Sequence, residues 1–238
     1  MKLAVASGAV ADGALPGLLG VAAARGAGLV VLPERVMGEA PDLSDGDGPR
    51  RLAGLARDAG VALLGGYVER CVTGTYNAAQ LVDRRGVVIA NYRQTHVARG
   101  ERGRWADGQW LTMMPLDGVM VGLLVGHDIE PPEPARALAV AGCGVLAVAG
   151  GASDGDAAVL LPARARENGI WLAWSGADPA IYGPDGRRHG IESDGLIVAD
   201  LDPPPMAGVG RPAWLRQRRP ALYGELTVRF DEEGARPE

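Results

Sequence analysis

Apolar runs of strand length alternate with segments of helical periodicity in the first part of the chain. The runs "KLAVAS" and "GLVVLP" are followed by segments that predict helices from Pro16 to about Arg25 and from Pro49 to about Ala59. Three strand-like runs then come in succession with no helix between them: "VALLGGYVER", "TYNAAQLVD" and "GVVIANY". Strands that precede helices and also pair among themselves are typical of an α/β protein with a mixed sheet.

The second half of the chain shows a similar pattern. The strand-like runs "GVMVGLLV", "GVLAVAG", "IWLAWSG" and "GLIVADLD" alternate with helical segments at about Glu133 to Ala141 and Asp156 to Asn168. Two similar halves predict two mixed sheets packed against each other. The later segments "PPP" and "RPAWLRQRRPALYGEL" predict an extended arm rather than another layer. We therefore expect one domain over residues 1–202 and a C-terminal arm over residues 203–238.

Composition and charge narrow the class of protein. The 238 residues are 47% hydrophobic, which is enough for one large core. No run of roughly 18 apolar residues exists, and the N-terminal apolar stretch is too short for a secretory signal, so we expect a cytoplasmic protein without a membrane partner. The net charge is −5 and the arginines are scattered among acids, which argues against a nucleic-acid partner. A small-molecule ligand is the expected partner.

Cysteine and lysine usage limits the available chemistry. Cys71 and Cys143 form no metal-ligand spacing, and we expect both to be structural thiols. Neither a metal nor a cofactor is expected. Lys2 is the only lysine in the chain, so any chemistry that needs a buried amine must use Lys2 or do without.

A site-like turn follows one of the apolar runs. In "VGLLVGHDIEPPE" the run ends abruptly at Gly126-His127-Asp128 and continues into an acidic, proline-rich segment. Strand ends of this kind are where α/β proteins place reactive groups. This turn contains no nucleophile.

Several motifs follow one another along the chain: "GAGLVVLPE", "NYRQTHV", "ERGRWADG", "GLLVGHDIEPPEPARALAVAG", "LPARARENGIWLAWSG", "GLIVADLD" and "RRPALY". Together they resemble the nitrilase, or carbon-nitrogen hydrolase, superfamily over nearly the whole chain up to about Tyr223. Their order and spacing carry the resemblance. It implies an α/β fold of four layers, an α-β-β-α sandwich. It also implies a homodimer that forms through helices and the C-terminal arm.

The resemblance further implies a cysteine that attacks an amide or nitrile carbon, a glutamate base, a lysine that steadies the tetrahedral intermediate and a second, assisting glutamate. The base matches Glu34 and the second glutamate matches Glu101. Gln94 stands where the family has its lysine, and Gly126 stands where it has its cysteine. The chain is thus expected to lack the catalytic cysteine and lysine. None of the remaining candidates is expected to replace them. Cys143 leads into the next strand at the far end of the sheet, and Cys71 is distant in the motif order. Lys2 opens the first strand, which we expect to place it at the sheet edge opposite the site.

Other residues of the expected pocket have two interpretations each. His127 introduces an imidazole that either acts as a proton donor or points away from the pocket. Gln94, Gly126 and Trp105 are candidate ligand contacts, although Trp105 alternatively only packs its loop. Glu34 is the candidate base, or it is simply an acid paired with Arg35.

Two neighbouring polar residues, Asp128 and His96, match positions that are structural in the family, and we expect them to be structural here as well.

Three functions remain open from the residues. The first is acid-base chemistry on a small amide- or amine-like metabolite, with Glu34 as base and His127 or Glu101 as proton donor. The second is a non-catalytic pseudoenzyme that serves as a binding or scaffold subunit. The third is residual amide hydrolysis by a water that Glu34 activates near Gly126.

Loss of the nucleophile costs a covalent hydrolase on the order of 10⁶ in turnover, which argues against the thioester mechanism. Two carboxylates in one apolar pocket favour the first and third functions, because burying them is unfavourable without a use.

Overall fold

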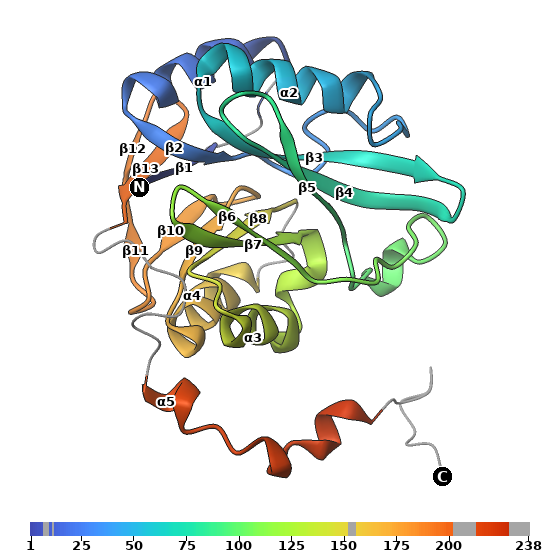
Figure 1. Ribbon diagram of the computed structural model, residues 1–238, viewed down its shortest axis with the longest axis vertical. Helices are drawn as coiled ribbons and strands as arrows, with labels where there is room; N and C mark the ends of the chain where they lie inside the picture. Colours follow the sequence, from blue (N-terminus) through green and yellow to red (C-terminus); the bar gives the residue numbers. More distant parts are fainter. Residues whose placement is uncertain (7–9, 11, 152–155, 202–212, 229–238) are drawn as a thin grey trace.

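The computed structural model describes residues 1–6, 10, 12–151, 156–201 and 213–228, and these form four layers. Two β-sheets pack face to face, with helices α1 and α2 on the outside of one sheet and α3 and α4 on the outside of the other (Figure 1). The predicted α-β-β-α sandwich is confirmed.

The first sheet holds seven strands in the order β12-β13-β1-β2-β3-β4-β5. β1, β2 and β3 run parallel, and the strands on either side of them pair antiparallel. The strands are β1 (Lys2–Ala6), β2 (Ala27–Val31), β3 (Ala62–Cys71), β4 (Gly74–Val82), β5 (Val88–Arg93), β12 (Ile191–Ser193) and β13 (Leu196–Asp200). Its covering helices are α1 (Leu15–Ala24), which the turn η1 (Asp12–Ala14) precedes, and α2 (Asp47–Ala59).

The second sheet holds six strands in the order β11-β10-β9-β8-β7-β6. β7, β8 and β9 are parallel, and the other neighbours pair antiparallel. The strands are β6 (Thr112–Leu116), β7 (Val119–Val125), β8 (Val145–Ala149), β9 (Trp171–Trp174), β10 (Ala180–Tyr182) and β11 (Arg188–His189). Its covering helices are α3 (Pro132–Ala141) and α4 (Ala157–Asn168).

The main core lies between the two sheets, and a second apolar layer lies under α1 and α2. Side chains alternate between the two faces of a strand. In β1, Leu3 and Val5 therefore join the cluster between the sheets, whereas Ala4 and Ala6 join the cluster beneath α1 and α2. A strand that is buried on both faces reads as a continuous apolar run, which is why "KLAVA" shows no polar alternation.

The sequence did not predict four of the strands, β6, β10, β11 and β12. β10, β11 and β12 have only two or three residues each, too few to show a periodicity. β6 carries Pro115, which lacks the backbone donor of a central strand and sits here on the edge of its sheet. The predicted helices are all present, and the largest difference at any end is that α2 begins at Asp47 instead of Pro49.

The described part of the C-terminal segment lies outside the layers, beside the α3 and α4 side of the molecule (Figure 1). It forms short helical turns, α5 (Ala213–Arg216), η4 (Pro220–Leu222) and η5 (Gly224–Thr227), rather than a wholly extended strand. Trp214 Nε1 donates to the backbone oxygen of Glu167 at 2.9 Å, and the buried Leu215 joins the main core. Residues 203–212 and 229–238 of the predicted arm lie outside the described residues.

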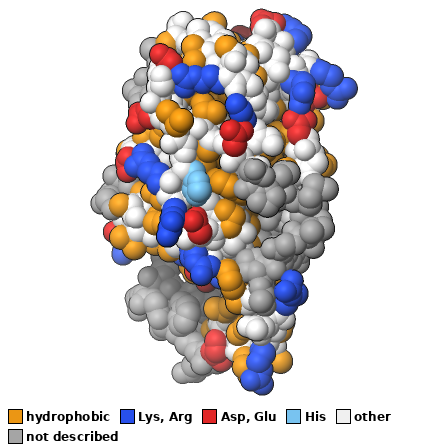
Figure 2. Space-filling model, turned by 90° about the vertical axis from the view of Figure 1, so that its left-hand side faces the viewer, with side chains coloured by type: hydrophobic (Ala, Val, Ile, Leu, Met, Phe, Trp, Pro, Cys, Tyr) orange, Lys and Arg blue, Asp and Glu red, His pale blue; other side chains and the backbone are white. Residues whose placement is uncertain are grey.

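The surface seen from the β10–β13 side mixes basic, acidic and apolar side chains without a patch of one sign (Figure 2). Within the described ranges, no helix has the length and apolar character needed to cross a membrane.

Candidate active site

Glu34 lies in the turn after β2, between a glycine of one sheet and the end of a strand of the other. Its backbone N–H donates to the Gly150 oxygen at 2.9 Å, just beyond β8. On the other side, a Cβ on Gly66 of β3 would lie 2.5 Å from the Glu34 Cα, so only glycine lets the two backbones approach this closely. The two sheets thus hold the backbone of Glu34 from opposite sides.

The Glu34 side chain is largely enclosed, with 9% of its surface exposed, and both carboxylate oxygens have partners. Asn77 Nδ2 donates to Oε2 at 2.8 Å, and Arg35 Nη2 pairs with Oε1 at 2.5 Å. Burial raises the pKa of Glu34, and the charge of Glu101 adds to this, while the Asn77 hydrogen bond and the Arg35 charge oppose it. The pairing with Arg35 that the sequence left open is present, and it lies inside the pocket.

A chain of side-chain amides continues from the carboxylate. Asn77 of β4 donates to Gln94 Oε1 at 2.9 Å, and Gln94 Nε2 in turn donates to the His96 oxygen at 3.0 Å. Asn77 donates from Nδ2 to both Glu34 and Gln94, whereas Gln94 accepts at Oε1 and donates from Nε2, so these contacts fix which way both amides face. Asn77 Oδ1 has no hydrogen-bond partner in the described part of the chain. Both amide side chains are buried.

Gly126 faces this group from the second sheet. It begins the turn η3 (Gly126–Ile129) directly after β7 and has a φ of +50°. A Cβ placed on it would lie 2.8 Å from Glu34 Oε2, 3.5 Å from Asn77 Nδ2 and 3.5 Å from Gln94 Nε2. The fold therefore brings Glu34, Gln94 and Gly126 together.

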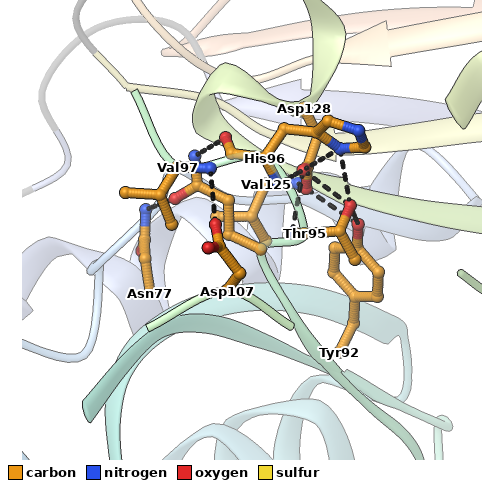
Figure 3. A network of polar contacts seen from close by, with 9 residues as sticks. Asn77, Tyr92, Thr95, His96, Val97, Asp107, Val125 and Asp128 are labelled. Atoms are coloured by element: carbon orange, nitrogen blue, oxygen red, sulfur yellow. Dashed lines mark hydrogen bonds and ion pairs between the residues drawn. The ribbon is translucent and has the colours of Figure 1, made fainter. Parts of the chain in front are cut away.

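Asp128 fixes the η3 turn to the end of β5. Its fully buried carboxylate accepts five hydrogen bonds of 2.8–3.1 Å, as Figure 3 shows. The donors are the Tyr92 hydroxyl, the Thr95 N–H and hydroxyl, the His96 N–H and the Val125 N–H. This arrangement holds the loop that carries Gln94 against the turn that carries Gly126.

His96 is placed by the same carboxylate. Its Nδ1 lies 3.4 Å from Asp128 Oδ1, and the hydrogen bond to Asp128 raises the pKa of this imidazole. Asp128 and His96 therefore contact each other and the backbone around the site, in line with the structural role expected for both.

A hydrogen bond joins two other candidate residues, Glu101 and Trp105, and the charge of Glu101 also acts on Glu34. Glu101 ends the turn η2 (Arg99–Glu101), and its Oε1 accepts from Trp105 Nε1 at 3.4 Å. Trp105 is buried against Val68 and Val97 in a small separate cluster. These contacts match the alternative in which Trp105 packs its own loop.

His127 follows Gly126 in η3 and is half-buried. Its backbone oxygen accepts from the Glu130 N–H at 3.0 Å, which closes the turn. No hydrogen bond joins its imidazole to any other residue in the described ranges. A role for this imidazole as proton donor stays a prediction.

A cavity of about 340 Å³ opens beside Glu34. Its walls are Val10 and the turn from Pro33 to Gly38, which includes Arg35. The cavity gives a ligand of a few heavy atoms access to the side of Glu34 that Arg35 occupies.

Both cysteines and the lysine lie away from Glu34. Cys143 stands just before β8, whose register pairs Val145 with Val121 at the end far from Gly126. Its Sγ donates to the Val145 oxygen at 3.0 Å, and burial raises the pKa of this thiol to about 12. Cys71 ends β3, five residues beyond Gly66, which is roughly 16 Å along a strand.

Lys2 begins β1, which is parallel to β2, whereas Glu34 follows the other end of β2. Its amine is therefore at the opposite edge of the sheet. No cluster of metal-binding side chains is present in the described ranges either.

Sequence reasoning missed Asn77, which bridges Glu34 and Gln94. The available signal was an amide in the middle of the otherwise apolar run "YNAAQLV", a residue that a buried strand holds only with partners for its polar atoms. It also overlooked Gly66 and Gly151, the second of two glycines after β8, which both leave space for Glu34. A Cβ on Gly151 would lie 2.0 Å from Glu34 Oε1.

Comparison with known proteins identifies the family of this chain. Residues 3–209 match the model of the carbon-nitrogen hydrolase family. The chain belongs to this family. It is 35% identical over 237 residues to a hydrolase encoded in the pqqF 5' region of Pseudomonas protegens, covering 87% of this chain and 83% of that protein. It is 32% identical over 249 residues to the human deaminated glutathione amidase, covering 86% of this chain and 76% of that one.

Among solved structures, an amidase from Nesterenkonia sp. superposes with a TM-score of 0.78 at 26% identity, covering 95% of this chain and 96% of that one. A glutamate-to-glutamine variant of the same amidase shows covalent addition of the acetamide moiety of fluoroacetamide at its active-site cysteine, with a TM-score of 0.78 at 25% identity over 94% of this chain and 96% of that one. The relatives of this carbon-nitrogen hydrolase family member thus include amidases, and one of them reacts through a cysteine.

Proposed function

We propose that this carbon-nitrogen hydrolase family member acts on a small amide- or amine-like metabolite by acid-base chemistry of Glu34, without a covalent cysteine intermediate. The observation that carries the proposal is the placement of Glu34. Its carboxylate is largely enclosed, has a raised pKa, borders a cavity and faces Gly126 rather than a nucleophile.

The absence of a thiol beside Glu34 supports a departure from cysteine chemistry. The Nesterenkonia amidase carries a reactive cysteine in its active site. Here Gly126 occupies the position that faces Glu34, and Cys71 and Cys143 lie elsewhere in the fold. A neutral Gln94 beside the carboxylate is consistent with a reaction that develops no strong negative charge at this point.

The contacts suggest how the site works. A carboxyl group with a raised pKa releases and takes up protons closer to neutral pH, which improves a general acid or base. Gln94 Nε2 donates one N–H to the His96 oxygen and lies 3.5 Å from the place of a Cβ on Gly126, where its second N–H would donate to a polar atom of a ligand bound there. In this proposal Glu34 moves the proton and Gln94 orients the ligand.

A non-catalytic binding subunit is the second candidate, and one observation favours it. Both Glu34 oxygens are already bonded within the protein, to Asn77 and to Arg35. The carboxylate also lies so near to Gly126 that it fills the space a side chain there would need. A ligand of a catalytic site would have to displace one of these contacts.

The test is a panel of small amides and amines incubated with the purified protein, with products identified by mass spectrometry. We expect turnover of a panel member to persist after Cys71 has been alkylated with iodoacetamide, and no acyl-enzyme to be visible in the intact mass. Activity lost in proportion to labelling of Cys71 or Cys143 would contradict the proposal.

Reaction in ¹⁸O-labelled water separates the remaining possibilities. Incorporation of ¹⁸O into a carboxylic acid product would indicate that Glu34 activates a water for amide hydrolysis. A product without ¹⁸O would indicate proton transfer alone. A protein that binds panel members and converts none would support the binding subunit.

A further inference from the structure

Arg35 holds its guanidinium against the carboxylate of the preceding residue, Glu34. The backbone of Arg35 adopts a left-handed conformation with a φ of +52°. This conformation is uncommon for residues other than glycine and is disfavoured by about 1–2 kcal/mol. This backbone conformation is accompanied by an ion pair of Arg35 Nη2 with Glu34 Oε1.

Two of the three guanidinium nitrogens of Arg35 have partners, and the third has none. Nε donates to Glu39 Oε1 at 2.8 Å, and Nη2 pairs with Glu34. Nη1 is buried and has no hydrogen-bond partner in the described ranges. A buried N–H without an acceptor is unfavourable by about 1–3 kcal/mol, so the position attracts an oxygen acceptor. Arg35 also lines the cavity beside Glu34.

We propose that Arg35 supplies the positive charge of the Glu34 pocket and that its Nη1 binds the carbonyl oxygen of a neutral amide ligand. The part that concerns the ligand rests on the proposed function, whereas the part that concerns the charge does not. Arg35 then has two effects: its ion pair sets the charge and the orientation of Glu34, and its Nη1 contacts the ligand.

The distribution of charge supports this assignment. Gln94 brings no charge to the site, and Lys2 begins β1 at the opposite edge of the sheet. Within the described ranges, Arg35 makes the only ion pair of Glu34. Arg35, the residue that follows Glu34, therefore supplies the positive charge of this pocket.

The same contacts indicate a neutral ligand. Arg35 already faces two carboxylates, Glu34 and Glu39, and the second of these is shared with Arg104 at 2.8 Å. A third carboxylate at Nη1 would add like-charge repulsion, whereas an amide carbonyl supplies the missing acceptor without it.

The first experiment follows the Glu34 carboxyl carbon by ¹³C NMR against pH in the full-length protein, with Glu34→Gln to assign the signal. Arg35→Met removes the charge and should raise the pKa of Glu34 above its value in the wild type. Arg35→Lys keeps a charge on the same backbone and should stay closer to the wild type. Arg57→Met removes the arginine of an exposed pair with Asp58 on α2 and serves as the control. The same Glu34 pKa in the wild type and in Arg35→Met would overturn the charge assignment.

The second experiment measures binding of butyramide and of butyrate by isothermal titration. We expect the wild type to bind the amide more tightly than the carboxylate, and Arg35→Met to bind the amide about tenfold or more weakly, as for loss of a hydrogen bond to a charged group. Equal amide binding by the wild type and Arg35→Met, or none by the wild type, would overturn the ligand assignment. A Glu34 pKa that responds to Arg35 in a protein without any turnover would reject the proposed function and leave the charge assignment intact.

Discussion

Gly126 and Glu34 face each other across the two sheets so closely that a Cβ on Gly126 would lie 2.8 Å from Glu34 Oε2. Real Cβ atoms do not approach other atoms to this distance, so a side chain at position 126 requires the carboxylate to move. Gly126 also has a φ of +50°, which glycine adopts at little cost. Both the crowding and the backbone conformation therefore favour glycine here.

Gly126→Ala should lower the free energy of unfolding, by about 1–3 kcal/mol, because it combines backbone strain with a contact to Glu34. Gly118→Ala is the matched control, since Gly118 has a φ of +81° and a Cβ there would meet nothing within 4 Å. Urea denaturation of both variants should show the larger loss at position 126. Equal losses would mean that the Glu34 contact adds nothing.

Asp128→Asn should destabilise the protein by about 3 kcal/mol. The buried carboxylate accepts hydrogen bonds from three residues of the loop and strand that carry Gln94, and an amide puts a donor where one of its acceptor oxygens was. Asp58→Asn, at an exposed acid on α2, should change stability by less than about 0.5 kcal/mol. A thermal or urea transition of Asp128→Asn that matches the control would contradict the role assigned to Asp128.

The fold was largely predictable because its elements are long and strongly patterned. β3 and β7 are buried along nearly their whole length, and α2 keeps a polar face, so these elements appear clearly in the sequence. The short strands β10 and β12 were not predictable, because they are too short to show a pattern. β10 and β12 have three residues each, and only pairing with β9 and β13 makes them strands.

The site was predictable in part. Motif order placed Glu34, Gln94 and Gly126 at strand ends, and strand ends of the two sheets meet in the fold. The contact of Asn77 with both Glu34 and Gln94 depends on the register of β4 against β5, which a local pattern does not give. The ion pair of Arg35 with Glu34 depends on a left-handed backbone at Arg35. Nothing in the local amino-acid sequence predicts this conformation.

The stability of the wild type should depend on pH through Glu34. Burial raises its pKa above the ordinary value of 4.5, so the folded protein binds this proton more tightly than the unfolded chain. The contribution of Glu34 to the free energy of unfolding is fully present below pH 4.5 and is lost as the pH rises through the folded pKa. Glu34→Gln removes this titration, so the variant should become more stable relative to the wild type as the pH rises.

The check is urea denaturation of both proteins at a series of pH values from about 4 to 8, the range in which a carboxyl with a raised pKa titrates. Glu192→Gln on the exposed strand β12 controls for the loss of one negative charge. Stability curves of the wild type and Glu34→Gln that run parallel over this range would show that Glu34 does not have the raised pKa described here.

The most direct test of the account is product formation by Glu34→Gln compared with the wild type, on whichever amide or amine the panel identifies. The substitution keeps the shape of the side chain and the acceptor for Asn77 but removes the base. We predict a fall in turnover of about 10²- to 10⁴-fold, in a variant that remains folded and with Glu192→Gln unaffected. Unchanged product formation by a folded Glu34→Gln protein would contradict the central claim that Glu34 carries the chemistry of this site.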